Sequence, residues 1–421
     1  MKTPLADGYA ERVLWHETAG PPPVVDEAPV PSAVDVVVVG SGYCGLAAAL
    51  SLAERGRSVA VLDRGALGEG ASTRNGGMVL PELKAGPESL VASYGELGRR
   101  MHAAVEEAFD HLESLTTGLG AIACEYERTG RIELAHGRRS AAGLRSLAAE
   151  LGAAARYVEG ADLAAEIGSS AFPAGLLVDR SGGLHPARFH AGLLARVAAC
   201  DGVTLHAGTP ATAVTSDGVT TPAGRVRARD VFLAVNAYAD RAVPALRRRT
   251  LPIGSFVLAT EALRAEQRCA VLPTRRMAYD TRNLLSYWRL DPDGRLVFGG
   301  RKGLARTAVP QARDDLYERM VRFHPQLAGV RVERAWCGDV ALTVDRLPHC
   351  GRVDGAWYAS GCNGSGVALM TWLGHRMAAA ICGEGLPPFA ELPHRPVPLH
   401  GLRSAWLPAA SAWFRLQDRR G

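Results

Sequence analysis

A glycine-rich turn close to the N-terminus carries the clearest chemical pattern in the sequence. Residues 36–45 read Val-Val-Val-Val-Gly-Ser-Gly-Tyr-Cys-Gly, so that Gly40, Gly42 and Gly45 have the spacing GxGxxG. In a strand-turn-helix unit, the first glycine permits a tight turn, the second lets the backbone approach a pyrophosphate, and the third lets the helix pack on the strand. The positive N-terminal end of the helix then faces the phosphates. The segment therefore predicts a site that holds a dinucleotide.

An acidic residue follows at the distance that such a site requires. The apolar run Val59–Leu62 is typical of a second parallel strand, and Asp63 lies 18 residues after Gly45. A carboxylate at this place can accept hydrogen bonds from an adenosine ribose. An ordinary strand-to-helix turn is the alternative, but the strand, the helix and the acidic residue together favour the dinucleotide site.

Two further glycine-rich segments extend the pattern. Residues 70–77 read Gly-Ala-Ser-Thr-Arg-Asn-Gly-Gly and bring Ser72, Arg74 and Asn75 close to the second strand, which is more than a nicotinamide enzyme needs. Residues 361–366 read Gly-Cys-Asn-Gly-Ser-Gly and lead into another helical segment. With these turns the sequence resembles the glycine oxidase and D-amino-acid oxidase superfamily of flavoproteins.

Within that superfamily, the sequence is most similar to bacterial gamma-glutamylputrescine oxidoreductases and related FAD-dependent amine oxidases. Besides the glycine-rich turns, the resemblance includes the segments 179–186, 236–238, 287–290, 299–301, 343–348 and 389–394. It implies an α/β fold in which a Rossmann-like FAD-binding domain of the glycine oxidase type joins a second, antiparallel β-sheet domain for the substrate. It also implies FAD as cofactor, a small-molecule amine as substrate and O2 as electron acceptor.

The resemblance also assigns the positions that bind FAD. Arg74 supplies a planar cation that suits a phosphate, with a surface salt bridge as its alternative role. Ser72 lines the flavin in the family, with a helix cap as its alternative role. Backbone N–H groups around Gly76 and Gly364 can hydrogen-bond the acceptor atoms of the isoalloxazine. The cofactor-binding positions are Gly40, Ser41, Gly42, Tyr43, Cys44, Gly45, Asp63, Arg64, Ser72, Thr73, Arg74, Asn75, Gly76, Gly77, Met78, Gly338, Gly361, Asn363, Gly364, Ser365, Gly366 and Val367.

Three positions bear on how the flavin is held. Relatives that attach FAD through a histidine carry it where this chain has Asn75. Sarcosine oxidases attach FAD through a cysteine near the position of Cys337, which we interpret here as a buried thiol beside the flavin. We therefore expect noncovalent FAD. Ser365 stands where many relatives have a histidine, and either a hydrogen bond to the flavin or a simple turn role stays open for it.

The expected catalytic residues come from three segments and are Tyr287, Arg289, Asp339 and Asn363. Tyr287 and Trp288 are neighbours on one strand and point to opposite faces, so one of these aromatic residues belongs to the core. Arg289 either faces the substrate or braces the sheet. Asp339 either attracts an ammonium group or makes a structural hydrogen bond.

Val340 bears on the class of substrate. Glycine and D-amino-acid oxidases clamp the α-carboxylate with an arginine two residues after the glycine of a Trp/Ala-Gly segment. In this chain the segment reads Trp336-Cys-Gly-Asp-Val340, so the arginine is replaced by valine. We therefore expect the substrate to be an amine that is oxidised at a CH2–N end. Any anionic group of this substrate is expected at its distal end, away from the carbon that is oxidised. Oxidation of an N-methylated or α-amino acid stays open as an alternative.

The electron acceptor is less constrained than the cofactor. Sarcosine oxidases activate O2 with a lysine near the flavin, whereas residues 295–301 offer only apolar or arginine side chains. An amine oxidase that forms H2O2 is the leading hypothesis. An amine dehydrogenase with another acceptor and a flavin-binding subunit without turnover are the other two.

Composition excludes several classes of function. The net charge is only +5 and the chain has no basic run, so we expect no nucleic-acid partner. No apolar segment approaches the ~20 residues of a membrane span, and residues 1–33 lack the basic start and apolar region of a signal peptide. We therefore expect a cytoplasmic protein without a membrane partner. The eight cysteines include no CxxC pair, which indicates neither a metal site nor a disulfide framework.

The apolar periodicity predicts the elements that position these residues. Helices are expected over 45–55, 88–118, 138–153, 186–200 and 367–382, strands over 59–62, 126–134, 204–206, 231–235 and 356–359, and a hairpin within 211–231. Alternation of period two over 253–300, with a turn at 291–294, predicts an antiparallel sheet. We expect a surface arm over 1–33, an FAD-binding domain made of 34–84, 184–248 and 335–384, a substrate domain made of 85–183 and 249–334, and a tail over 385–421.

Overall fold

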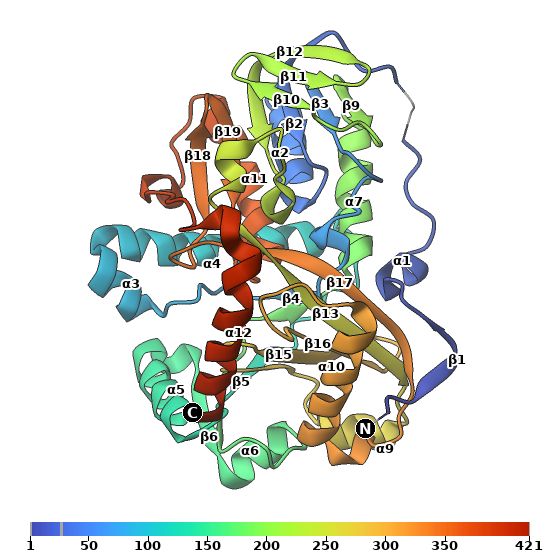
Figure 1. Cartoon of the computed structure of the whole chain (residues 1–421), viewed down its shortest axis with the longest axis vertical. Helices are drawn as coiled ribbons and strands as arrows, with labels where there is room; N and C mark the ends of the chain where they lie inside the picture. The colour runs from blue at the N-terminus through green and yellow to red at the C-terminus, as the bar shows by residue number, and fades with distance from the viewer. Residues whose placement is uncertain (1, 26–27, 421) are drawn as a thin grey trace.

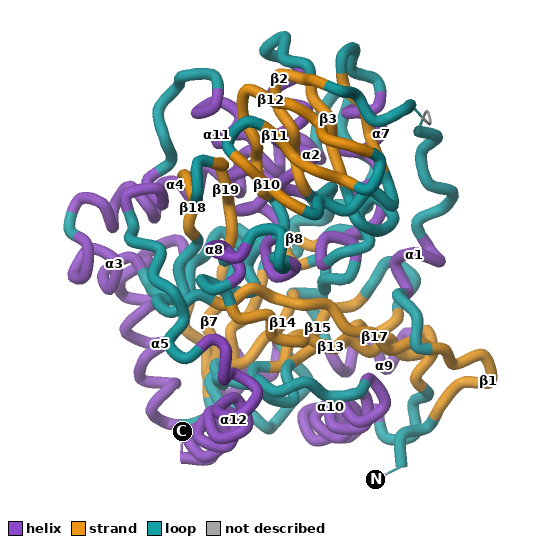
Figure 2. The backbone as a smooth tube through the Cα atoms, turned by 45° about the horizontal axis from the view of Figure 1, so that its top comes forward, coloured by secondary structure: helices purple, strands orange, loops and turns teal. Residues whose placement is uncertain are grey.

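Two large sheets organise the chain in the computed structural model, which describes residues 2–25 and 28–420. The first has the strand order β10-β11-β12-β2-β3-β9, with β19 paired to β12 and β18 paired to β19. Its strands are β2 (Ala33–Val39), β3 (Val59–Leu62), β9 (Val203–His206), β10 (Ala213–Thr215), β11 (Gly218–Thr221), β12 (Gly224–Leu233), β18 (His349–Val353) and β19 (Ala356–Ser360). This sheet occupies the upper part of the molecule in Figures 1 and 2.

Strand β2 is buried on both of its faces. Val36 and Val38 pack into a core that includes residues of the helices on one side, whereas Val37 and Val39 pack into a second core on the other side. Its pairs with β12 and β3 are parallel, and β3 pairs parallel with β9. This is the arrangement that the continuous apolar runs predicted.

The second sheet has nine strands in the order β1-β17-β13-β16-β15-β14-β5-β7-β6. Its strands are β1 (Leu5–Ala10), β5 (Arg131–Leu134), β6 (Arg156–Glu159), β7 (Ala174–Val178), β13 (Leu251–Ala262), β14 (Met277–Asp280), β15 (Ser286–Leu290), β16 (Arg295–Gly300) and β17 (Val332–Leu342). The predicted antiparallel pairing within 253–300 is confirmed for β13 with β16, β14 with β15, and β15 with β16. A third, two-stranded sheet pairs β4 (Met78–Val79) with β8 (Gly182–Gly183).

Most predicted helices form close to their expected bounds. The exception is 88–118, which is broken at Gly95, where a φ of 57° separates two helices. The expected strand over 126–134 is also shorter and covers only Arg131–Leu134. The α-helices are α1 (Leu14–Thr18), α2 (Tyr43–Ala53), α3 (Pro87–Tyr94), α4 (Glu96–Thr116), α5 (Arg138–Leu151), α6 (Gly160–Glu166), α7 (Pro186–Ala198), α8 (Pro244–Arg247), α9 (Ala265–Val271), α10 (Val309–Phe323), α11 (Val367–Ile381) and α12 (Arg403–Arg420).

The N-terminal residues are a folded part of the molecule, which corrects the expectation of an arm laid over the surface. Strand β1 pairs in parallel with β17 at the edge of the nine-stranded sheet. Trp15 in α1 is only 1% exposed and packs at an edge against Trp336 of β17. The proline-rich composition gave no sign of this segment's anchors, which are the pairing of β1 and the buried side chains of Val13, Leu14 and Trp15.

The strands of the two sheets come from different parts of the chain. All strands of the first sheet fall within 34–84, 184–248 and 335–384, apart from the first residue of β2. Strand β17 crosses the expected boundary at 335 and belongs to the other sheet, as does β1. The tail contains α12, whose Ser411 accepts a hydrogen bond from the N–H of Leu304 at 2.7 Å. Helix α12 therefore packs on the segment that follows β16.

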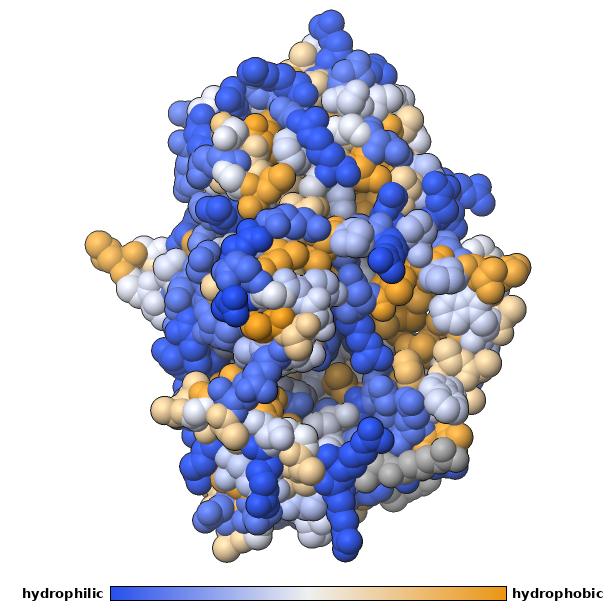
Figure 3. Space-filling model, turned by 90° about the vertical axis from the view of Figure 1, so that its left-hand side faces the viewer, coloured by the Kyte–Doolittle hydropathy of each residue, from blue (hydrophilic) through white to orange (hydrophobic). Residues whose placement is uncertain are grey.

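No helix within residues 2–25 and 28–420 is long and apolar enough to cross a membrane. The face shown in Figure 3 is mostly polar, and its apolar side chains form separate groups. The same residues contain no cluster of His, Cys, Asp and Glu side chains that would hold a metal ion.

Candidate active site

Two adjoining cavities lie where the sheets meet the predicted glycine-rich turns. The larger cavity, of about 490 Å³, is lined by the turn 40–42 and by Asp63. The smaller cavity, of about 120 Å³, is lined by Tyr287, Arg301 and Val340. Four residues line both cavities, namely Ala71, Arg74, Gly338 and Asp339. The two cavities are therefore direct neighbours.

Asp63 holds the first glycine-rich turn in shape. One carboxylate oxygen accepts the backbone N–H of Ser41 at 2.9 Å and its hydroxyl at 2.6 Å, and the other accepts the N–H of Gly65 at 3.1 Å. The same carboxylate lines the larger cavity. Asp63 thus fixes the turn from the end of β3 and still faces the space where a ribose is expected.

Gly45 lets α2 begin directly against this turn. A Cβ atom on Gly45 would lie 1.8 Å from the carbonyl oxygen of Gly40, a distance that no real contact reaches. Gly40 itself has a φ of +104°, a conformation that a side chain disfavours. The N–H of Tyr43 in the first turn of α2 donates to the hydroxyl of Ser72 at 3.0 Å. Ser72 therefore caps the helix and also lines the larger cavity.

Three side chains hold three successive carbonyl groups of the second glycine-rich turn. The indole N–H of Trp336 donates to the carbonyl oxygen of Arg74 at 2.8 Å, and that of Trp15 donates to Asn75 at 2.8 Å. The Nε of Arg289 donates to the carbonyl oxygen of Gly76 at 2.7 Å.

These three bonds set the direction of the peptide groups in the turn. Carbonyl oxygens that face the protein leave N–H groups facing the other way, because C=O and N–H point oppositely in a trans peptide. The N–H of Gly76 has no partner within the described residues, and Gly76 lines the smaller cavity. It is therefore a free donor toward a ligand there.

We predict that Trp15→Phe weakens this turn. The substitution keeps the buried ring but leaves the carbonyl of Asn75 without a donor, which costs about 1–3 kcal/mol. The melting temperature and the affinity for the cofactor should both fall. Trp413→Phe is the matched control because Trp413 is 54% exposed and should change neither quantity. Equal behaviour of the two variants in thermal unfolding and cofactor titration would contradict this role of Trp15.

Tyr287 lies at the smaller cavity, and its neighbour Trp288 belongs to the core. The ring of Tyr287 lies so close to Gly76 and Gly299 that a Cβ atom on either glycine would come within 2.7 Å of it. Its hydroxyl lies 3.3 Å from the Oγ atom of Ser255. Trp288 is fully buried on the opposite face. Trp288 is therefore the aromatic residue that belongs to the core, and Tyr287 is the one that lines the smaller cavity.

Arg289 and Asn363 take structural places, unlike the catalytic places expected for them. Arg289 is buried, lines neither cavity, and also donates to the carbonyl oxygen of Leu184 at 2.7 Å. The side chain of Asn363 accepts the N–H of Thr343 at 3.1 Å and donates to the carbonyl of Gly361 at 2.6 Å. Both polar side chains satisfy nearby backbone groups, which keeps their polar atoms away from a substrate.

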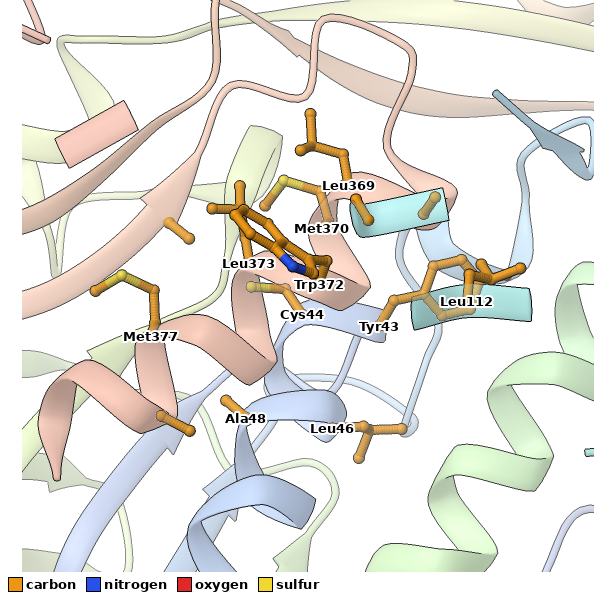
Figure 4. Close-up of a cluster of buried hydrophobic side chains, with 14 of the residues drawn as sticks. Tyr43, Cys44, Leu46, Ala48, Leu112, Leu369, Met370, Trp372, Leu373 and Met377 are labelled. Carbon is orange, nitrogen blue, oxygen red and sulfur yellow. The ribbon is translucent and has the colours of Figure 1, made fainter. Parts of the chain in front are cut away.

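The predicted cofactor positions divide into two groups. Those that line a cavity are Gly40, Ser41, Gly42, Asp63, Arg64, Ser72, Arg74, Asn75, Gly76, Met78, Gly338, Gly364, Ser365 and Val367. Those that line neither are Tyr43, Cys44, Gly45, Thr73, Gly77, Gly361, Asn363 and Gly366. Tyr43 and Cys44 join the cluster of apolar side chains between α2 and α11 (Figure 4). Members of the second group shape the turns around the cavities.

A partly buried pair of acidic residues at the smaller cavity, Glu82 and Glu133, had no counterpart in the sequence motifs. Glu82 lines that cavity and pairs with Arg131 at 2.8 Å. The hydroxyl of Tyr279 lies 2.7 Å from Glu82 and 3.1 Å from Glu133. One phenolic proton cannot serve two carboxylates, and burial together with the charge of Glu82 raises the pKa of Glu133. Ser365 donates to Glu82 at 3.4 Å, so this glutamate is its partner within the protein.

We predict that Glu133→Gln changes how stability depends on pH. An acid with a raised folded-state pKa stabilises the fold below its unfolded pKa, and this contribution is lost as the pH rises through the folded value. The amide does not titrate, so the variant should melt higher than the parent at pH 8, and the difference should shrink toward pH 5. Glu107→Gln is the control, because Glu107 is exposed. A difference between variant and parent that stays constant with pH would contradict the raised pKa.

The turn around Asp63, the helix that starts on it and the two joined cavities define an enzyme that binds a dinucleotide across a Rossmann-like sheet. The comparisons with known proteins specify this class. The family model described as FAD dependent oxidoreductase (DAO) matches residues 35–380. Gamma-glutamylputrescine oxidoreductase of Escherichia coli K12 is 33% identical over 410 residues, covering 92% of this chain and 93% of that protein.

Two further comparisons agree in family and fold. A probable oxidoreductase, OrdL, of Haemophilus influenzae is 31% identical over 367 residues, which are 83% of each chain. The crystal structure of glycine oxidase from Geobacillus kaustophilus has a TM-score of 0.71 at 21% identity, covering 87% of this chain and 100% of that chain. The chain therefore belongs to the DAO family of FAD-dependent oxidoreductases. It is an enzyme that uses FAD and acts on small-molecule amines or amino acids.

The residues around the cavities fit this cofactor. The backbone of the turn 40–42 at the start of α2 suits a pyrophosphate. The carboxylate of Asp63 suits a ribose, and the free N–H of Gly76 suits an acceptor atom of the flavin. At Gly42 a Cβ atom would come within 2.7 Å of the Ser72 hydroxyl, so a side chain there would disturb the turn.

Proposed function

We propose that this enzyme oxidises the CH–NH bond of a primary or secondary terminal amine, of the gamma-glutamylputrescine type, and passes the electrons to O2 with formation of H2O2. Val340 carries the proposal, because it lines the smaller cavity at the position where α-amino acid oxidases of this superfamily have their carboxylate clamp. An apolar side chain there offers no partner to an α-carboxylate. The identity to the E. coli oxidoreductase named for gamma-glutamylputrescine supports the same class of substrate.

The protein's task in this chemistry is to bind, orient and desolvate the amine. Bound FAD supplies the acceptor for the hydride that leaves the carbon next to nitrogen. Tyr287, Leu285 and Val340 give the smaller cavity an aromatic and apolar wall, which favours the neutral form of the amine over its ammonium form. Asp339 lines the same cavity and can hold the ammonium before it loses its proton. Water then hydrolyses the released imine to an aldehyde and ammonia, or to an aldehyde and an amine where the substrate is a secondary amine.

Anaerobic mixing tests the proposal directly. The purified yellow protein is mixed with gamma-glutamylputrescine, diamines and ω-amino acids while the absorbance of the flavin near 450 nm, roughly the cofactor's own maximum, is followed. We expect at least one terminal amine to bleach the flavin within the time of an enzymatic turnover. Absence of bleaching with every terminal amine, together with bleaching by an α-amino acid, would overturn the proposal.

The electron acceptor is tested separately. The proposal of O2 as the electron acceptor rests on the oxidase-type fold. No side chain of strand β16 adds support, because this strand lacks the lysine with which sarcosine oxidases activate O2. Oxygen consumption with stoichiometric H2O2 during amine turnover is the expected result. Flavin that is reduced by an amine but reoxidised only by a quinone or an electron-transfer protein would identify an amine dehydrogenase.

Oxidation of an α- or N-methylated amino acid is the second candidate for the substrate, and one observation favours it. The guanidinium of Arg301 lines the same cavity as Val340 and can pair with a carboxylate. Where that carboxylate lies in the substrate decides between the two candidates.

We predict that FAD is released when the protein is denatured by acid. Asn75 replaces the linking histidine, and its amide donates to the carbonyl of Ser72 at 2.8 Å. Cys337 lines the larger cavity, and burial raises the pKa of its thiol to about 11, so the nucleophilic thiolate is scarce. After precipitation the yellow colour should be in the supernatant. Colour that stays with the polypeptide, and is lost in Cys337→Ser, would show a cysteinyl link instead.

A further inference from the structure

We propose that Arg301 and Asp339 form a bipolar subsite for an amine substrate that also carries a carboxylate several bonds from the oxidised carbon. Arg301 would bind the carboxylate, and Asp339 would bind the ammonium group. The inference rests on the amine oxidation proposed above and adds the charge pattern of the substrate. It comes from the two charged side chains that line the smaller cavity without a partner in the protein.

The backbone of Arg301 is fixed, whereas its guanidinium group is free. The N–H of Arg301 donates to the carbonyl of Leu285 at 3.4 Å, and its carbonyl accepts a hydrogen bond from Arg319 at 3.0 Å. Its side chain has no hydrogen bond or ion pair within the described residues, although it lines the smaller cavity. The guanidinium lies against the third glycine-rich turn, where a Cβ atom on Gly364 would be 3.2 Å from it.

Arg289, a buried arginine of the neighbouring strand β15, gives a comparison for the partly buried Arg301 that follows β16. Arg289 donates to the carbonyl groups of Gly76 and Leu184, each at 2.7 Å. The side chain of Arg301 has no such acceptors within residues 2–25 and 28–420, and burial lowers the pKa of its guanidinium group. A carboxylate is the ligand that best satisfies a planar guanidinium, because it can accept two parallel N–H donors.

Asp339 presents the opposite charge to the same space. Its backbone N–H donates to the hydroxyl of Tyr238 at 3.3 Å, but its carboxylate has no partner among residues 2–25 and 28–420. Asp339 and Arg301 do not form an ion pair with each other in spite of the shared cavity. By contrast, Glu82, which lines the same cavity, forms an ion pair with Arg131 at 2.8 Å. Arg301 and Asp339, each without a partner of opposite charge within the described residues, therefore fit a ligand that carries one charge of each sign.

The test uses the FAD-loaded enzyme and two amines of equal length. These are 5-aminopentanoate, which has the distal carboxylate, and pentylamine, which lacks it. We expect the parent to be reduced at lower concentrations by 5-aminopentanoate, with a ratio of apparent dissociation constants of about 100. Arg301→Met should bring this ratio near 1. Arg301→Lys, which keeps the charge but not the planar donor pair, should retain part of the preference.

Two control variants separate this role from general charge effects. Lys302→Met also removes one positive charge. Lys302 is the next residue in the chain, but its side chain lines neither cavity, so this variant should keep the parental ratio. Asp339→Asn should weaken both amines by a similar factor, because both carry the ammonium group. FAD content is measured for every variant. A loss of FAD affinity in Arg301→Met with an unchanged ratio would show that Arg301 binds the cofactor and would overturn the inference.

Binding of pentanoate, which has no amino group, gives a readout without turnover. It should perturb the flavin spectrum of the parent, and Arg301→Met should need about 100-fold more pentanoate for the same change. If no amine reduces the parent but pentanoate still binds through Arg301, the proposed function fails and the carboxylate site stands. If amines reduce the parent and Arg301→Met leaves both the ratio and the pentanoate titration unchanged, the subsite is wrong and the function stands.

Discussion

Replacing Gly45 with alanine is expected to remove FAD from the protein. The new methyl group would lie 1.8 Å from the carbonyl oxygen of Gly40, so either α2 or the turn 40–42 must move by more than an ångström. Overpacking typically costs about 1–3 kcal/mol, and we expect at least the upper end of this range here because the neighbour is backbone and cannot change rotamer. On the scale of ~1.4 kcal/mol per decade, the dissociation constant of FAD should rise at least ~100-fold.

A second glycine gives the matched control. Gly143 lies inside α5, is exposed, and has open space where its Cβ atom would be. Gly143→Ala should therefore raise stability by about 0.5–1 kcal/mol and leave FAD bound. Titration of the two apoproteins with FAD, followed by thermal unfolding, distinguishes the local clash from a general effect of the substitution. Parental FAD affinity in Gly45→Ala would mean that the close contact of α2 with the turn is not needed for the site.

The parts of the site that the sequence predicted depend on local backbone geometry. Gly40, Gly42 and Gly45 are recognisable because a tight turn and a close helix demand glycine at fixed spacing. Asp63 is recognisable because it ends the next strand, and the structure places it beside that turn. The apolar run Val59–Leu62 is buried throughout its length, as a central parallel strand requires. These signals need no knowledge of distant contacts.

The parts that the sequence did not predict depend on contacts between remote segments. Trp15 donates to Asn75, 60 residues away, and Arg289 donates to Gly76, 213 residues away. A tryptophan in a proline-rich stretch and an arginine on a strand carry no signal of such partners. Glu82 likewise belongs to no motif, and its place at the cavity follows from its pairing with Arg131 of β5.

The same limitation applies to the roles of charged side chains. Sequence reasoning left Arg289 open between facing the substrate and bracing the sheet. Its acceptors, the carbonyl groups of Gly76 and Leu184, instead show that it holds the second glycine-rich turn and the segment after β8. Arg301 directly follows strand β16, and its side chain has no acceptor within the described residues. Whether an arginine serves structure or ligand is decided by how many acceptors the fold brings to it.

Simple α-amino acids are expected to be poor substrates. Glycine, sarcosine and D-alanine carry their carboxylate next to the reacting carbon, and Val340 lines the cavity where relatives place the arginine that binds it. A desolvated carboxylate without its bidentate partner loses about 2–5 kcal/mol. This corresponds to a kcat/KM that is lower by a factor of roughly 30 to several thousand than for a well-bound terminal amine.

Steady-state kinetics over one panel tests this expectation. Gamma-glutamylputrescine, putrescine and 5-aminopentanoate are compared with glycine, sarcosine and D-alanine at equal FAD occupancy. Because the carboxylate clamp acts in both the ground state and the transition state, its absence should appear mainly as a higher KM. A value of kcat/KM for glycine, sarcosine or D-alanine equal to that of the best terminal amine would contradict the prediction. Loss of that activity in Arg301→Met would then show that Arg301 binds an α-carboxylate and that the enzyme oxidises α-amino acids.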